Sequence, residues 1–172
     1  MPGTGASPQI LGLADIGPAM LPLVGGKAAN LGVLTAAGLS VPEGFCLTTS
    51  AYRQATGADG HVQGRLSELH AALKATADDD LAALAALAAR AREVVLSAPV
   101  PPETVEAIER AYGAMGNDVP VAVRSSATAE DLPSASFAGQ QDTYLNVVGT
   151  ASVGGAVRNC WASLWTDRAV SY

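Results

Sequence analysis

Apolar residues recur at helical spacing through the middle of the chain. Residues 65–96 are rich in leucine and alanine, and Leu81, Leu84, Leu87 and Ala88 follow one another at intervals of three or one, as on one face of a helix. A stripe of this kind is typical of a buried core face rather than of a cofactor site. The spacing therefore predicts two helices here, which a run of aspartates separates.

Shorter segments nearer the N-terminus carry strand and turn signals. "QILGLADI" predicts a short strand and a turn, and "GFCLTT" predicts a second strand. Between them, "LPLVGGKAANLGVL" leads through two glycines into a helix, with Leu31, Leu34 and Ala28 expected on one apolar face. Ser50 is expected to cap the helix after the second strand. Residues 57–64 are polar and predict a break between helices.

The stretch "VAVRSSATAEDLPSASFAGQQDTYLNV" (residues 121–147) is the most unusual part of the sequence. Its start predicts a strand that ends at Arg124, and the alternation after Gly139 predicts one arm of a hairpin. The helix pattern "PETVEAIERAYGAMG" precedes it, and "ASVGGAVRNCWASLWTDRAVSY" predicts a helix after it. Helices mixed with short strands indicate an α+β fold.

Composition narrows the class of protein. Of 172 residues, 49% are hydrophobic and 15% are charged, which favours a folded core over disorder. The net charge of −6 argues against a general nucleic-acid or anionic-membrane binder, because such proteins need a basic face. The N-terminus lacks the pattern of a signal peptide, and we expect no stretch long and apolar enough to cross a bilayer. We therefore expect a cytoplasmic protein.

The cysteines and histidines do not indicate a metal site. Cys46 and Cys160 lie in apolar surroundings and are expected to be buried thiols in a reducing compartment, although the sequence alone leaves a disulfide open. Neither cysteine has the spacing of a zinc site, and His61 and His70 lie in the helical middle of the chain.

Lys27 directly follows a glycine pair that opens a helix. Glycines can turn their backbone N–H groups toward a ligand, a helix N-terminus favours an anion, and the lysine adds positive charge. The spacing of a Walker P-loop is absent. "VGGK" is therefore a candidate phosphate site, and the competing interpretation is an ordinary turn followed by an exposed lysine.

Arg124 is the second candidate phosphate ligand. A guanidinium at the end of a strand can bind phosphate oxygens through two parallel hydrogen bonds. The competing interpretation is an ion pair with Glu130 or Asp131, and spacing alone does not separate the two. These carboxylates could also bind magnesium, but we favour a role in fixing the loop.

Gly139 in "FAGQ" and Thr143 in "QDTY" are placed where a glycine-rich hairpin could close over a phosphate chain with backbone N–H groups and hydroxyls. An ordinary β-turn would explain the same residues.

Together, "GGKAANLGVL", "GLSVPEGFCLTTSAY", "VAVRSSATAEDLPSASFAGQQDTYLNV" and "CWASLWTDRAVSY" closely resemble the N-terminal nucleotide-binding domain of the phosphoenolpyruvate synthase and pyruvate phosphate dikinase family, which includes rifampicin phosphotransferases. The resemblance covers residues 10–172, although residues 55–118 match only as helices. Residues 1–9 are expected to be a disordered lead, and the rest is expected to be the N-terminal part of an ATP-grasp-like domain, truncated at its C-terminus.

The resemblance implies that Lys27 and Arg124 contact ATP phosphates and act in catalysis, and that Gly139 and Thr143 belong to the nucleotide site. It also implies that Mg²⁺ ligands and the histidine that carries the phosphoryl group lie beyond residue 172. The family passes the β-phosphate of ATP through that histidine to pyruvate or to rifampicin. Val33 and Ser134 depart from residues common in the family, glutamate and aspartate, without removing an expected phosphate contact.

Two other classes of function stay open on the sequence. The chain could be a catalytically incomplete module that binds a nucleotide or a partner, or a purely structural helical protein. The purely structural protein is the least favoured of these, because a helical bundle has no structural need for the loop at residues 121–147.

Overall fold

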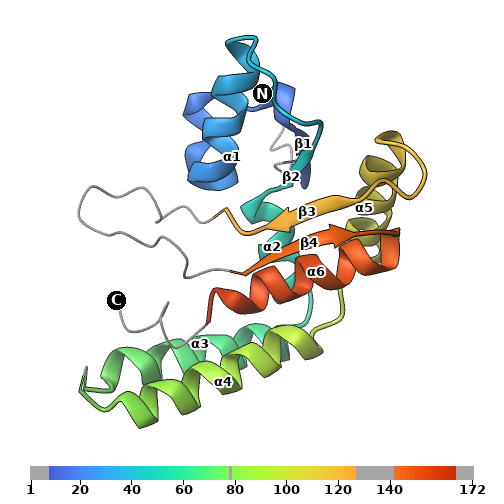
Figure 1. The fold of residues 1–172 in the computed structure, drawn as a ribbon. Coiled ribbons are helices and arrows are strands. Elements are labelled where there is room, and N and C mark those ends of the chain that lie inside the picture. The colour runs from blue at the N-terminus through green and yellow to red at the C-terminus, as the bar shows by residue number, and fades with distance from the viewer. Residues whose placement is uncertain (1–7, 78, 127–141, 166–172) are drawn as a thin grey trace, which may run out of the picture.

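The computed structural model describes residues 8–77, 79–126 and 142–165, and the chain has the predicted α+β character (Figure 1). Two short antiparallel strand pairs are formed by β1 with β2 and by β3 with β4. The strands are β1 (Ile10–Gly12), β2 (Phe45–Leu47), β3 (Val121–Arg124) and β4 (Thr143–Val147). The helices are α1 (Leu21–Ala36), α2 (Thr49–Gly57), α3 (Gly60–Ala75), α4 (Leu81–Ser97), α5 (Pro102–Ala114) and α6 (Thr150–Ser163), with short 3-10 turns at Leu13–Asp15 and Pro18–Met20.

Helices α3 and α4 form an antiparallel hairpin that packs beneath α6 (Figure 1). Leu84 and Ala88 of the predicted stripe are buried, whereas Leu81 at the start of α4 is 65% exposed. The break before α3 is shorter than residues 57–64, because the Asp59 carboxylate accepts the backbone N–H of His61 at 2.8 Å and begins the helix at residue 60. The Asp80 carboxylate caps α4 in the same way.

The helix after the second strand, α2, begins two residues earlier than expected. Its N-cap position is Thr48 and not Ser50. The hydroxyl of Thr48 makes no capping hydrogen bond and instead donates to the carbonyl of Pro8 at 2.7 Å. Thr48 is buried and connects Pro8 to the end of β2. It stands at the N-cap of α2, two residues before the serine that was predicted there.

Helix α1 buries its small residues rather than its leucines. Leu31 and Leu34 are 36% and 40% exposed, while Ala28 and Gly32 are buried. A Cβ atom on Gly32 would lie 2.3 Å from the carbonyl oxygen of Ile16, so the glycine is what lets the two backbones meet. Expecting Leu31, Leu34 and Ala28 to share one environment was therefore wrong.

By length and composition, the segment Pro18–Ala36 could cross a bilayer, with 19 residues and a mean hydropathy of 1.2. The prediction that no stretch is long and apolar enough was therefore wrong. In the fold, this segment supplies Val24, Ala28 and Ala29 to a core cluster with Ile16 and Cys46. A helix that carries one face of a protein core passes the same compositional test.

Helices α5 and α6 pack on the inner face of the strands. Tyr112 of α5 joins the segment before β3 to the segment after β4, at the same end of the strand pair. Its hydroxyl donates to the carbonyl of Val119 at 2.8 Å and accepts the backbone N–H of Gly149 at 2.9 Å. Val123 of β3 and Val147 of β4 pack with Tyr112 in the same cluster. The inner face is thereby fixed, and the outer face of the pair points away from α6.

A β-bulge in β4 decides which side chains reach that outer face. Val121 pairs with Val147 but Val123 pairs with Tyr144, so β4 contains one residue more than β3 between these two pairs. Asn146 has φ of 54°, the left-handed conformation common at bulges. Because of the extra residue, Val147 and Tyr144 both face inward while Thr143 faces outward.

Candidate functional site

Gly25 interrupts the helical backbone of α1. Its φ of 77° and ψ of 168° lie outside the helical region, so the regular helix that carries Lys27 starts after it. Glycine adopts a positive φ without the steric cost that other residues bear. The predicted glycine turn is confirmed, and it stands inside α1 rather than before it.

The restarted helix lies against the end of β3. The hydroxyl of Ser126 accepts the backbone N–H of Ala28 at 3.0 Å, across 98 positions of sequence. A Cβ atom on Gly25 would lie 1.9 Å from the carbonyl oxygen of Ser126 and 2.7 Å from its hydroxyl. The two motifs predicted to bind phosphate, "GGK" and "VRSS", are therefore in direct contact through their backbones.

Lys27 occupies the second position of the restarted helix and is partly buried. Gly25 and Gly26 beside it are buried. A lysine in the first turn adds its charge to the positive end of the helix dipole, and this combination attracts anions. The geometry thus places one of the two predicted cations at the junction of α1 with β3.

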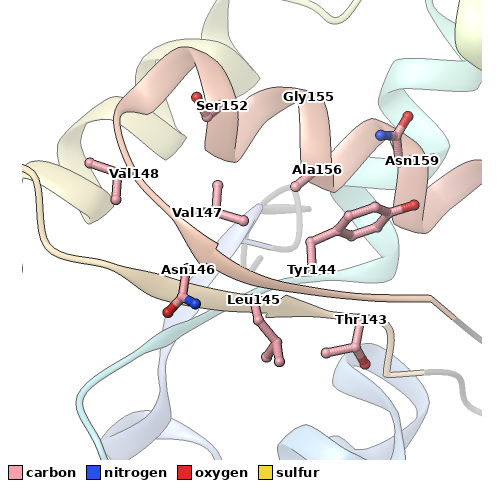
Figure 2. Close-up of a pocket in the computed structure, with 10 residues that line it drawn as sticks. All are labelled: Thr143, Tyr144, Leu145, Asn146, Val147, Val148, Ser152, Gly155, Ala156 and Asn159. Atoms are coloured by element: carbon pink, nitrogen blue, oxygen red, sulfur yellow. The ribbon is translucent and has the colours of Figure 1, made fainter.

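Arg124 and Thr143 are brought together directly. They are opposite each other in the register of β3 and β4, and both are exposed. Residues opposite each other in an antiparallel pair have Cβ atoms about 4.5–5.5 Å apart on the same face. Figure 2 shows that the side chains of Thr143 and Leu145 lie on the side of β4 that faces away from α6.

An open hollow of about 690 Å³ runs along β4 and α6, with Thr143 at one end (Figure 2). Its other lining residues are neutral, among them Tyr144, Ser152 and Asn159. A polyphosphate requires positive charge or several donors. The hollow is therefore not the feature that marks the candidate site, which lies where α1 meets the end of β3.

Asp142, the residue before β4, contacts both β4 and α6. The hydroxyl of Tyr144 donates to the Asp142 carboxylate at 2.9 Å, and the Cys160 thiol lies 3.8 Å from the Asp142 carbonyl oxygen. Burial first, and then the Asp142 carboxylate, raise the pKa of Tyr144 to about 12. The contact with Asp142 thus favours the protonated phenol, which donates the hydrogen bond.

Of the predicted site residues, Lys27, Arg124 and Thr143 lie in the described part of the chain. Gly139, Glu130 and Asp131 lie outside the described residues. Sequence reasoning missed Ser126, because nothing local signals a contact with Ala28. It also missed the bulge, for which an asparagine inside a strand pattern was the available signal.

Within residues 8–77, 79–126 and 142–165, no group of three or more His, Cys, Asp or Glu residues is arranged to hold a metal ion. Both cysteines are buried and free, as expected for thiols that pack as small apolar groups. The described residues thus offer cationic and hydroxyl groups to an anion, and they do not offer a carboxylate set to a cation.

Comparison with known proteins agrees with the resemblance drawn from the motifs. The family described as pyruvate phosphate dikinase, AMP/ATP-binding domain, matches residues 21–172. A rifampicin phosphotransferase of Streptomyces sviceus is 47% identical over 164 residues, which cover 95% of this chain and 18% of the relative. A phosphoenolpyruvate synthase of Aeropyrum pernix is 46% identical over 171 residues, covering 95% of this chain and 20% of the relative.

A phosphoenolpyruvate synthase of Escherichia coli is 44% identical over 179 aligned residues, covering all of this chain and 22% of the relative. The chain thus spans about a fifth of the length of these curated relatives. With a match that covers residues 21–172 and relatives above 40% identity, the chain belongs to the pyruvate phosphate dikinase AMP/ATP-binding domain family.

Proposed function

We propose that this chain is the N-terminal part of an ATP-binding domain of ATP-grasp type, in a phosphotransferase that passes the β-phosphate of ATP through a phosphohistidine to a small-molecule acceptor. Relatives named phosphoenolpyruvate synthase and rifampicin phosphotransferase support pyruvate and rifampicin as the two candidate acceptors. The carrier histidine belongs to a domain outside this chain. We further propose a cytoplasmic location, with neither nucleic acid nor membrane as a partner, in keeping with the net charge of −6.

The observation that carries the proposal is the contact between the helix start at Lys27 and the strand end that follows Arg124. Ser126, two residues after Arg124, accepts the amide of Ala28, the residue after Lys27. Two cations from distant parts of the sequence are thus attached to backbone segments that touch. Thr143, opposite Arg124, adds a hydroxyl on the same face.

Such a constellation suits phosphoryl transfer. Charge accumulates on the phosphoryl oxygens, and the protein contributes mainly positioning and electrostatic stabilisation. Lys27 and Arg124 would neutralise this charge, and the Arg124 guanidinium can also fix orientation through paired hydrogen bonds. By family resemblance, Gly139 would let its backbone approach the phosphates. ATP would arrive with Mg²⁺, for which the described residues supply no ligand set.

Titration calorimetry of the full-length protein with ATP and Mg²⁺ tests the proposal. Arg124→Ala should weaken ATP binding by about 10- to 100-fold, because a charge-assisted hydrogen bond contributes about 1.5–3 kcal/mol. Arg65→Ala removes another exposed arginine, from α3, which lies below α6 and away from β3 in Figure 1, and should leave binding unchanged. Equal affinities in all three proteins would overturn the role given to Arg124.

The alternative is a catalytically incomplete module that binds a nucleotide or a partner. The intact mass of the natural product separates the two, because a mass several-fold above 17.3 kDa indicates a multidomain enzyme, whereas a mass near that value indicates the module. In a multidomain product, phosphorus NMR of reactions with pyruvate or with rifampicin identifies the acceptor. Turnover with neither would favour the module.

A further inference from the structure

The restarted helix of α1 lacks a capping side chain of its own. At a helix N-terminus, the side chain of the N-cap residue normally accepts the backbone N–H of the second or third helical residue. Here the N-cap position is held by Gly25, which has no side chain, and the third helical residue is Ala28. The Ala28 N–H is nevertheless satisfied, by the hydroxyl of Ser126 at 3.0 Å.

Ser126 fills the space that a capping side chain would take. The nearest atoms to a Cβ built on Gly25 are the carbonyl oxygen, carbonyl carbon and hydroxyl oxygen of Ser126, at 1.9, 2.4 and 2.7 Å. Gly25 must therefore lack a side chain to leave room for Ser126, and the Ser126 hydroxyl accepts the N–H that an N-cap side chain would otherwise accept. The two residues form one complementary contact between α1 and the end of β3.

We propose that Ser126 is a positioning residue of the nucleotide site, a helix cap supplied from a distant strand that holds Lys27 in register with Arg124. This inference rests on the proposed function. Lys27 directly precedes the residue whose amide Ser126 accepts, and Arg124 lies two residues before Ser126. Movement at this one contact would change the spacing of both cations, although Ser126 itself need touch no phosphate.

The cap also limits how an anion can use the helix start. The amide of the third helical residue, Ala28, is engaged by the Ser126 hydroxyl, so this N–H group is not open to an incoming phosphate. A negative charge at position 126 would keep a capping oxygen near the helix but repel the phosphates.

Hydrogen exchange of the full-length protein without nucleotide tests the cap itself. In Ser126→Ala, the peptide spanning α1 should exchange faster than in the wild type, because the Ala28 amide loses its acceptor. Ser126→Thr keeps a hydroxyl and should exchange as the wild type does. Ser67→Ala removes an exposed hydroxyl that is bonded within α3 and serves as the matched control. Equal exchange of the α1 peptide in wild type and Ser126→Ala would overturn the cap.

Calorimetry with ATP and Mg²⁺ tests the positioning. The usual cost of losing an N-cap corresponds to about a fivefold change in an equilibrium constant, so Ser126→Ala should weaken ATP binding about fivefold or more. Ser126→Thr should restore most of the affinity. Ser126→Asp should leave α1 protected in hydrogen exchange and yet weaken ATP binding further than Ser126→Ala does. A protected Ser126→Asp protein with wild-type affinity for ATP would contradict the proposal.

A double-mutant cycle separates positioning from general weakening. If Ser126 acts through Lys27, then Ser126→Ala should cost less affinity in a Lys27→Ala background than in the wild type. Strictly additive losses would show that Ser126 does not act through Lys27. Failure of the proposed function is recognised differently, because wild type, Arg124→Ala and Lys27→Ala would then give the same heats while the exchange result for Ser126 still stands.

Discussion

Arg124 and Thr143 are direct cross-strand partners on the outer face of β3 and β4. A cationic side chain and a hydroxyl thus share one exposed patch, although 18 residues separate them along the chain. The arrangement depends on the bulge at Asn146, which turns Thr143 outward while Val147 stays in the core. The strand pair therefore serves both as a wall of the core and as a platform for the candidate site.

Replacing Thr143 by valine removes the hydroxyl and keeps the shape of the side chain. We expect ATP affinity of the full-length protein to fall about 3- to 10-fold, the effect of one neutral hydrogen bond of about 0.5–1.5 kcal/mol. Thr143→Ser should retain most of the affinity. Calorimetry measures both, and a valine variant with undiminished affinity would remove Thr143 from the site.

The bulge at Asn146 should tolerate glycine and resist a β-branched residue. Asn146→Val should lower the free energy of unfolding by about 1–2 kcal/mol, because the left-handed conformation is costly for a residue with a branched Cβ. Asn146→Gly should stay close to the wild type. Chemical denaturation compares the three proteins, and equal stability of the valine variant would mean that the bulge is not required.

Gly25 should be the least replaceable glycine of α1. Gly25→Ala combines a positive φ with a collision against Ser126, and we expect a loss of about 2–4 kcal/mol in the free energy of unfolding. Gly64 of α3 has open space around its Cα, so Gly64→Ala should raise stability by about 0.5–1 kcal/mol. The opposite signs of these two matched changes, seen in denaturation curves, are the test.

The raised pKa values of the two buried thiols predict that the protein loses stability in alkaline solution. Burial raises the pKa of Cys46 and of Cys160 from 9.0 to about 11. Between pH 9 and 11 the unfolded chain releases protons that the folded chain retains, so these thiols favour folding fully below pH 9 and progressively less up to pH 11. Denaturation at pH 8, 9 and 10 should show this fall.

A variant with both cysteines replaced by alanine serves as the control, because its stability should depend less on pH over this range. In the native wild type at pH 8, both thiols should also react slowly with a disulfide reagent and quickly in denaturant. Rapid reaction of the native protein at pH 8 would contradict the burial that raises the pKa of both groups.

Local features of the fold were readable from the sequence because they depend on local chemistry. The glycine turn before Lys27, the strand ending at Arg124 and the helix opened by Pro102 each follow from backbone preferences of a few neighbouring residues. The buried face of α1 was not readable, because hydrophobicity favours leucines whereas close packing on Ile16 requires Gly32.

The candidate site was readable as a set of residues and not as an arrangement. Arg124 and Thr143 stood out by residue type, but their register depends on one extra residue in β4. Ser126 could not be assigned, because its role comes from an amide 98 positions away. Single-sequence patterns report local periodicity, and long-range contacts are set by packing that they do not contain.

The span between Ala28 and Ser126 also sets an order of events during folding. The α3–α4 hairpin joins neighbouring segments and can form early, whereas the junction of α1 with β3 closes a loop of nearly a hundred residues and bears the associated entropy cost. During synthesis, the glycine turn leaves the ribosome well before its partner strand exists. The helix that carries Lys27 therefore remains without this cap until Ser126 has been made.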